Sequence, residues 1–260
     1  MDLGIKGKYA LVTGGTHGIG LAIALALADE GCNVAVCSRN QARVARAVAD
    51  LKARGVEGIG LCADVLIRSD IERVMKAVIG SWGTIHILVN NVGGGGRWGS
   101  PIVEETPEEV WIDVYNKNAM AAVRFTMRAI PFMRKQKWGR VITITSVYGR
   151  EGGGRPWFNM AKTAQTTLMK NLALNYDLAR DGITFNSVAP GCIMIPDTGW
   201  DYEQKKDPEA FKKMLDEKFP LGRLGTPEEV ASVVVFVCSE QASLLNGASI
   251  PVDGAEGRSF

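Results

Sequence analysis

The chain has 260 residues, of which 46% are hydrophobic and 22% are charged, and its formal net charge is +2. This composition is typical of a globular protein and excludes a disordered chain, and the length suits one large α/β domain. So small a positive charge indicates neither nucleic acid nor an anionic membrane as a partner. No apolar run reaches the ~18 residues of a bilayer-spanning helix, and the first residues lack the pattern of a signal peptide.

The cysteines and histidines predict neither disulfides nor a metal site. The five cysteines form no Cys-x-x-Cys pair, which favours reduced core thiols and a cytoplasmic location. They are Cys32, Cys37, Cys62, Cys192 and Cys238. The two histidines, His17 and His86, lie far apart without partners at ligand spacing, so no metal is expected.

Short apolar runs alternate with amphipathic stretches along the whole chain, a pattern typical of βαβ units and a parallel sheet. In chain order, the predicted strands are Tyr9–Thr13, Asn33–Cys37, Gly58–Ala63, Ile87–Asn90, Val141–Thr145, Thr184–Ala189 and Ser249–Val252. The predicted helices are Ile19–Glu30, Gln41–Arg54, Ser69–Ile79, Pro107–Lys135, Pro156–Arg180 and Pro227–Ser239. The strands lack a clean polar–apolar alternation, as expected where helices cover both faces. The fold predicted for residues 1–260 is a single α/β domain with a Rossmann-type, doubly wound parallel seven-stranded sheet and helices on both faces.

A glycine-rich turn connects the first predicted strand to the first helix. Glycines at this point let the backbone turn sharply and approach a pyrophosphate, while the helix start offers free N–H groups. The turn predicts nucleotide binding by Gly14, Thr16, His17, Gly18, Ile19 and Gly20.

The end of the second strand indicates which dinucleotide binds. An acidic residue there accepts a hydrogen bond from the ribose 2′-hydroxyl and repels a 2′-phosphate. This chain has Ser38, Arg39 and Asn40 instead. Because a guanidinium and a hydroxyl bind phosphate well, the sequence favours NADP(H) over NAD(H).

The spacing Gly14-x-x-x-Gly18-x-Gly20, together with Asn90-Asn91-Val92-Gly93, resembles the short-chain dehydrogenase/reductase family. The resemblance covers nearly the whole chain. Within the family, the chain is similar to 3-oxoacyl carrier-protein reductases and to sugar or polyol dehydrogenases. The resemblance implies reversible carbonyl/alcohol conversion on a small-molecule substrate, and a homotetramer.

The resemblance also implies positions along the cofactor. Asp64 and Val65 would flank the adenine, and Asn90 would lie near the adenosine ribose. The loop after Pro190 and Gly191 would lie near the carboxamide. In that loop, the backbone of Ile193 would bind the carboxamide. Lys162 would bind the hydroxyl groups of the nicotinamide ribose.

One catalytic position departs from the family pattern. The family uses Asn, Ser, Tyr and Lys, and this chain has Asn118, Ser146, Phe158 and Lys162. In the family, the Tyr hydroxyl exchanges a proton with the substrate oxygen, the Ser orients that oxygen, the Lys lowers the phenol pKa, and the Asn backbone holds a water. Phe158 keeps the ring and lacks the proton, so weakened activity is expected.

Three explanations of Phe158 stay open: an introduced Tyr→Phe change that traps substrate and cofactor, a natural loss, or a relocated acid such as Tyr148 or a water. Two other functions compete with a reductase. One is a non-catalytic or regulatory NADP(H)-binding protein. The other is acid–base chemistry without net hydride transfer, as in an isomerase or dehydratase.

The loops after the fourth, fifth and sixth strands carry arginines and aromatic residues. The expected substrate residues are Arg97, Trp98, Tyr148, Arg150, Arg155, Trp157, Met194 and Trp200. Guanidinium groups and flat rings favour a polar or acidic substrate, such as a keto acid, a sugar or a 3-oxoacyl thioester. Residues 192–221 are expected to form a substrate lid, with a charged, exposed and mobile flap at residues 201–207.

Overall fold

In the computed structural model, which describes residues 1–259, seven parallel strands form one sheet in the order β3-β2-β1-β4-β5-β6-β7. The strands are β1 (Tyr9–Thr13), β2 (Asn33–Ser38), β3 (Gly58–Cys62), β4 (Ile87–Asn90), β5 (Gly139–Ile144), β6 (Ile183–Pro190) and β7 (Ser249–Val252). The predicted fold class and all seven predicted strands are confirmed, with small shifts at the strand ends. Apolar side chains on both faces of each central strand explain why the sequence lacks alternation.

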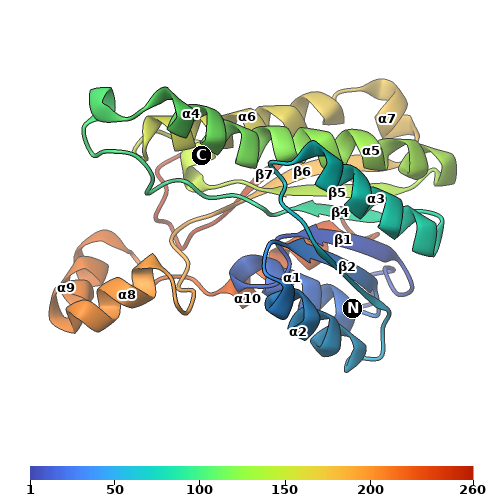
Figure 1. Ribbon diagram of the computed structural model, residues 1–260, viewed down its shortest axis with the longest axis horizontal. Coiled ribbons are helices and arrows are strands. Elements are labelled where there is room, and N and C mark those ends of the chain that lie inside the picture. Colours follow the sequence, from blue (N-terminus) through green and yellow to red (C-terminus); the bar gives the residue numbers. More distant parts are fainter. Residues whose placement is uncertain (260) are drawn as a thin grey trace.

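Helices cover both faces of the sheet (Figure 1). One layer contains α1 (Gly18–Asp29), α2 (Gln41–Lys52) and α10 (Pro227–Val237). The other contains α3 (Arg68–Trp82), α4 (Glu108–Tyr115), α5 (Ala121–Gln136), α6 (Pro156–Ala173) and α7 (Tyr176–Arg180). Two apolar clusters fill the space between the sheet and these layers.

Two of the predicted helices are interrupted. The predicted helix Pro107–Lys135 contains a π-helical turn at Asn116–Met120, between α4 and α5. Wide turns of this kind often mark functional sites. The predicted helix Pro156–Arg180 divides into α6 and α7, because the Asn175 side chain accepts a hydrogen bond from the Leu178 N–H and so starts a new helix.

Helix α10 begins with a reciprocal pair of caps. Thr226 Oγ1 accepts a hydrogen bond from the Glu229 N–H at 3.3 Å, and Glu229 Oε2 accepts one from the Thr226 N–H at 2.8 Å. The sequence Thr226-Pro227-Glu228-Glu229 predicts a helix start with Thr as the N-cap and Pro in the first turn. Thr226 is the N-cap of α10, and the reciprocal contact from Glu229 adds to it.

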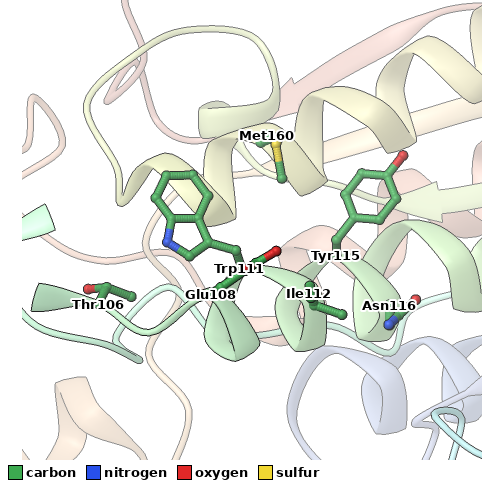
Figure 2. Close-up of a pocket in the computed structure, with 7 residues that line it drawn as sticks. All are labelled: Thr106, Glu108, Trp111, Ile112, Tyr115, Asn116 and Met160. Carbon is green, nitrogen blue, oxygen red and sulfur yellow. The ribbon is translucent and has the colours of Figure 1, made fainter. Parts of the chain in front are cut away.

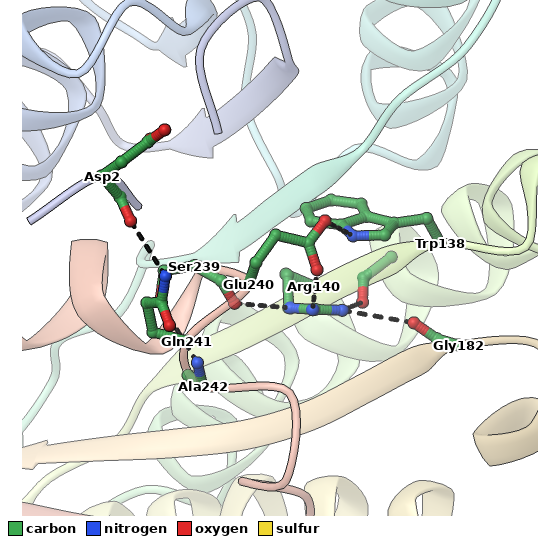
Figure 3. Close-up of polar contacts among 9 residues, drawn as sticks. Asp2, Trp138, Arg140, Gly182, Ser239, Glu240, Gln241 and Ala242 are labelled. Atoms are coloured by element: carbon green, nitrogen blue, oxygen red, sulfur yellow. Dashed lines mark hydrogen bonds and ion pairs between the residues drawn. The ribbon is translucent and has the colours of Figure 1, made fainter. Parts of the chain in front are cut away.

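Polar contacts close the amino end of the sheet around Arg140 (Figure 3). This side chain is buried, and it donates to the carbonyls of Ser239 at 3.3 Å and Gly182 at 3.2 Å. Its guanidinium also lies 3.6 Å from the Glu240 carboxylate and stacks on Trp138, with 4.4 Å to the ring centroid. This end of the sheet is therefore sealed by structural contacts, and the loops that remain open follow the carboxyl ends of the strands.

The expected lid contains two helices, α8 (Gly199–Lys206) and α9 (Pro208–Lys218), which lie apart from the two layers (Figure 1). The sequence analysis predicts no helix here, and residues 201–207 were expected to form a charged, exposed flap. The Asp207 side chain caps α9 by accepting from the Ala210 N–H at 3.0 Å. A small cluster formed by Phe211, Phe219 and Leu224 holds the lid together. Within residues 1–259, no helix combines the length and apolar character needed to cross a membrane.

Candidate functional site

A groove of about 800 Å³ lies at the carboxyl ends of the strands. The strand order reverses direction at β1, whose neighbours are β2 and β4, and ligands of open α/β sheets bind at such a point. The predicted cofactor residues that line the groove are Gly14, Thr16, His17, Gly18, Ile19, Gly20, Ser38, Arg39, Asn40, Asp64 and Val65. The structure therefore brings most of the predicted cofactor residues together.

The glycine-rich turn brings backbone N–H groups to the groove. Gly14 and Gly18 have φ angles of +67° and +54°, which residues with a side chain rarely adopt. A Cβ on Gly20 would lie 2.4 Å from the Gly14 carbonyl oxygen. His17 precedes α1 and makes no side-chain cap. The N–H groups at the start of α1 are thus available to an anion.

The end of β2 provides groups suited to a phosphate. Ser38 Oγ is buried and has no hydrogen-bond partner within residues 1–259. Arg39 and Arg43 are exposed where they line the groove. Asn40 is less available, because its side chain caps α2 by accepting from the Arg43 N–H at 2.9 Å. The sequence analysis did not single out Arg43 as a cofactor residue. It could have been found from its place in the first turn of α2, which follows Arg39 and Asn40.

Asn90, expected near the adenosine ribose, does not line the groove. Its side chain is only 3% exposed and donates to Thr126 Oγ1 at 3.0 Å and Thr143 Oγ1 at 3.3 Å. Asn91 lines the groove instead, and its Nδ2 donates to the Thr13 carbonyl at 2.9 Å. Successive residues of an extended chain point to opposite sides, so the two asparagines have different surroundings.

The loop after β6 includes the predicted cofactor residues Gly191 and Ile193. Pro190 ends β6, and the Gly191 N–H donates to the Val252 carbonyl at 3.1 Å. Cys192 and Met194 both bond to Gly225, which leaves the N–H of Ile193 without a hydrogen bond within residues 1–259. Ile193 is 7% exposed and lines a smaller cavity beside Gly225 and Val252 rather than the groove.

The predicted catalytic residues Ser146 and Lys162 lie on neighbouring elements. Ser146 follows β5, and its Oγ accepts from the Tyr148 N–H at 3.2 Å. Lys162 on α6 is 4% exposed and donates from Nζ to the Ile144 carbonyl at 3.0 Å. Nζ lies 5.6 Å from the centroid of the Phe158 ring. Burial lowers the pKa of Lys162 to about 7.

Asn118 anchors the glycine-rich loop after β4. Its Nδ2 donates to the Gly94 carbonyl at 2.8 Å, and its Oδ1 accepts from the Gly94 N–H at 3.2 Å. A Cβ on Gly93 would lie 2.7 Å from Asn118 Oδ1 and 3.0 Å from Lys162 Nζ. Glycine at 93 therefore lets the loop, Asn118 and Lys162 approach one point.

Gln165 is a buried neighbour of Asn118 that the sequence analysis did not single out. Its Nε2 donates to the Asn118 carbonyl at 3.1 Å, and its Oε1 has no partner within residues 1–259. The available signal is its position three residues after Lys162, which places both on one helix face.

A second cavity, of about 810 Å³, lies next to Phe158. Four predicted substrate residues line it: Arg97, Tyr148, Arg155 and Trp200. Gly96 also lines it, while Gly93 of the same loop lines the cofactor groove. The two cavities thus share the loop that Asn118 holds.

The other four predicted substrate residues do not line this cavity. Trp157 is fully buried, packs on Trp111 with 5.3 Å between ring centroids, and lies on the inner face of α6. Trp98 lines the cofactor groove rather than the substrate cavity. Arg150 donates to the Ser249 carbonyl and so turns toward β7. Met194 packs in the apolar cluster of the lid.

The charged and ionisable groups of the substrate cavity are largely engaged. Arg97 forms an ion pair with Glu203 at 2.6 Å, and Arg155 donates to the Ser100 carbonyl at 2.9 Å. Burial, together with the nearby Cys192 and the acids Glu256 and Glu151, raises the pKa of Tyr148. Its phenol is therefore a weaker acid than a free tyrosine.

An apolar pocket of about 660 Å³ lies elsewhere, between α4 and α6 (Figure 2). Its lining residues are Thr106, Glu108, Trp111, Ile112, Tyr115, Asn116 and Met160. Ile112 and Met160 are 50% and 46% exposed. The pocket has no grouping of acid, base and nucleophile, and it lies away from the glycine-rich turn.

Residues 14–255 match the family model described as "Enoyl-(Acyl carrier protein) reductase". The chain is 36% identical to dehydrogenase/reductase SDR family member 4 of Bos taurus over 252 residues, covering 96% of this chain and 87% of that protein. It is also 36% identical to 3-oxoacyl-[acyl-carrier-protein] reductase FabG of Pseudomonas aeruginosa over 253 residues, covering 97% of this chain and 98% of that protein.

A solved structure shares the fold along its whole length. L-sorbose reductase from Gluconobacter frateurii, in complex with NADPH and L-sorbose, is similar with a TM-score of 0.90 and 34% identity, and each chain is covered to 100%. The sequence matches, the parallel sheet and the groove at its carboxyl edge agree with one another. The chain belongs to the short-chain dehydrogenase/reductase family of oxidoreductases.

Proposed function

We propose that this protein is an NADP(H)-dependent oxidoreductase that interconverts a carbonyl and a secondary alcohol on a polar or acidic substrate, weakened by Phe158. The observation that carries the proposal is the shared glycine-rich loop between the two cavities. A cofactor in the first cavity and a substrate in the second would meet beside Lys162 and Ser146.

The groove fits a dinucleotide with a 2′-phosphate. The start of α1 offers N–H groups to the pyrophosphate, and Asp64 and Val65 line the part assigned to the adenine. Ser38, with its unpartnered buried hydroxyl, and Arg39 would bind the 2′-phosphate. The backbone N–H of Ile193 would donate to the carboxamide. The bound cofactor would supply or accept the hydride.

The chain's own residues would orient the substrate oxygen and supply charge. Ser146 Oγ would donate a hydrogen bond to that oxygen, and the Lys162 ammonium would bind the nicotinamide ribose. Phe158 has no proton to transfer, and loss of a general acid lowers a rate by ~10²–10⁴. Because its pKa is raised, Tyr148 is a poor substitute acid.

The cavity and the relatives support a polar or acidic substrate. Arg97, Arg155, Tyr148 and Trp200 suit a sugar, a keto acid or a 3-oxoacyl thioester. The structurally similar reductase binds L-sorbose, and FabG of Pseudomonas aeruginosa is a 3-oxoacyl reductase. Both support a polar ketone as substrate.

The test compares the chain with its Phe158→Tyr variant. NADPH oxidation and NADP⁺ reduction are followed with keto sugars, keto acids and acyl thioester ketones. The variant should gain ~10²-fold or more on at least one substrate. Phe236→Tyr, which adds the same hydroxyl on the exposed side of α10, should gain nothing. Cofactor binding without turnover by any variant would instead favour a non-catalytic NADP(H)-binding protein.

We also propose a cytoplasmic homotetramer. All five cysteines are unpaired, which suits a reducing compartment. The apolar pocket on α4 and α6, and the exposed Ile112 and Met160 beside it, offer a surface for a second copy. Light scattering after size-exclusion chromatography measures the mass, and a monomeric mass would overturn the assembly.

A further inference from the structure

Lys117 and Trp98 lie together on the wall of the cofactor groove. Lys117 belongs to the π-helical turn, and Trp98 belongs to the glycine-rich loop after β4. The Lys117 Nζ is 4.5 Å from the centroid of the Trp98 ring, within the range of a cation–π interaction. The sequence predicts neither residue as a cofactor ligand.

No carboxylate within residues 1–259 forms an ion pair with Lys117. Within residues 1–259, Lys117 makes no ion pair or hydrogen bond, and its side chain is half-buried. Burial and the nearby Arg39 lower its pKa, and Asp64 opposes them. Keeping a partly desolvated cation unpaired costs free energy, so its placement is best explained by an anion that enters the groove.

The groove as a whole favours such an anion. Arg39, Arg43 and Lys117 line it, and Asp64 is the sole carboxylate among its lining residues. A concave wall with this excess of positive charge concentrates anionic ligands. The cation at 117 is part of that field.

Local contacts hold Lys117 and Trp98 in place. Asn118, the next residue, bonds to both the N–H and the carbonyl of Gly94. A Cβ on Gly94 would lie 3.7 Å from Lys117 Nζ. The Trp98 N–H closes a tight turn by donating to the Gly95 carbonyl at 3.1 Å. Lys117 and Trp98 therefore belong to the same turn and the same loop that Asn118 joins.

We propose that Lys117 and Trp98 form a clasp that binds a phosphate group of the dinucleotide cofactor. The ammonium donates to the phosphate, and the indole ring holds the lysine over the groove. This inference rests on the proposed NADP(H) binding. The phosphate is either the pyrophosphate, which all nicotinamide dinucleotides carry, or the 2′-phosphate of NADP(H).

The test measures the Kd of NADPH and of NADH by calorimetry for the chain and for Lys117→Met. Loss of a charge-assisted hydrogen bond should weaken NADPH binding by about 10-fold to 100-fold. Lys117→Arg should restore most of the affinity, and Trp98→Leu should weaken binding by a smaller factor. Lys135→Met, which removes an exposed charge at the end of α5, should leave both Kd values unchanged.

Each outcome has one meaning. If Lys117→Met loses equal affinity for NADPH and NADH, Lys117 binds the pyrophosphate. If it loses affinity for NADPH alone, Lys117 binds the 2′-phosphate. Unchanged Kd values in a Lys117→Met protein with a native circular dichroism spectrum would overturn the clasp while leaving the proposed function intact. Failure of the parent chain to bind either cofactor would overturn both.

Discussion

Arg97 Nη1 donates to Glu203 Oε1 at 2.6 Å, and this ion pair joins the glycine-rich loop after β4 to helix α8 of the lid. The Arg97 guanidinium also lies 4.8 Å from the centroid of the Trp200 ring. Because Arg97 and Trp200 both line the substrate cavity, the pair holds the lid against the wall of the candidate active site.

Breaking this pair should loosen the lid without unfolding the protein. Both side chains are about half exposed, and such pairs contribute only ~0–1 kcal/mol to stability. We expect Glu203→Gln to leave Tm nearly unchanged and to increase the rate of limited proteolysis within residues 199–218. Glu217→Gln removes an ion pair within α9 and should not raise that rate. Equal cleavage of both variants would contradict a role of the Arg97–Glu203 pair in holding the lid.

Gly199→Ala should have the same effect by a different route. A Cβ at residue 199 would lie 2.4 Å from Arg97 Nη1. The end of a flexible side chain moves more readily than backbone, so Arg97 should leave Glu203 while α8 stays folded. The double variant Gly199→Ala/Glu203→Gln should be cleaved no faster than either single variant, since both remove one interaction. Additive increases in the cleavage rate would show two separate effects.

Ser38→Ala should separate cofactor binding from stability. The buried Ser38 hydroxyl has no partner within residues 1–259, and an unsatisfied buried group costs ~1–3 kcal/mol. We expect an unchanged or higher Tm together with weaker NADPH binding. Thr13→Val is the matched case, because Thr13 Oγ1 accepts from the N–H groups of Asn91 and Val92. Thr13→Val should lower Tm. A lower Tm for Ser38→Ala would contradict the view that the Ser38 hydroxyl is unpartnered until the cofactor binds.

Lys162 should make stability depend on pH. Burial lowers its pKa to about 7 from the ordinary 10.5, so between these values the unfolded chain binds more protons than the folded one. Stability therefore rises with pH across this window. Lys162→Met should flatten the rise, measured as the free energy of urea unfolding from pH 7 to pH 10 without cofactor. A parent and a variant with parallel pH profiles would show that Lys162 titrates normally.

Much of the candidate site could be predicted because its signals are local. The glycines between β1 and α1 and the serine and arginine that end β2 act through backbone geometry and charge at adjacent positions. The sequence also places Phe158 four residues before Lys162, one helical turn away. Lys117 was not predicted, because its contact with the Trp98 ring joins residues that are distant in the chain.

The sequence by itself determined the strand and helix pattern, the cofactor groove and the loss of the phenolic hydroxyl at 158, since each follows from short-range periodicity or residue identity. Tertiary structure alone decided that Trp157 is core while Phe158 faces the cavity, and that Asn91 rather than Asn90 lines the groove. Neighbouring residues of similar chemistry differ only in the direction of their side chains. That direction is set by the packing of α6 and β4 against elements far away in the chain.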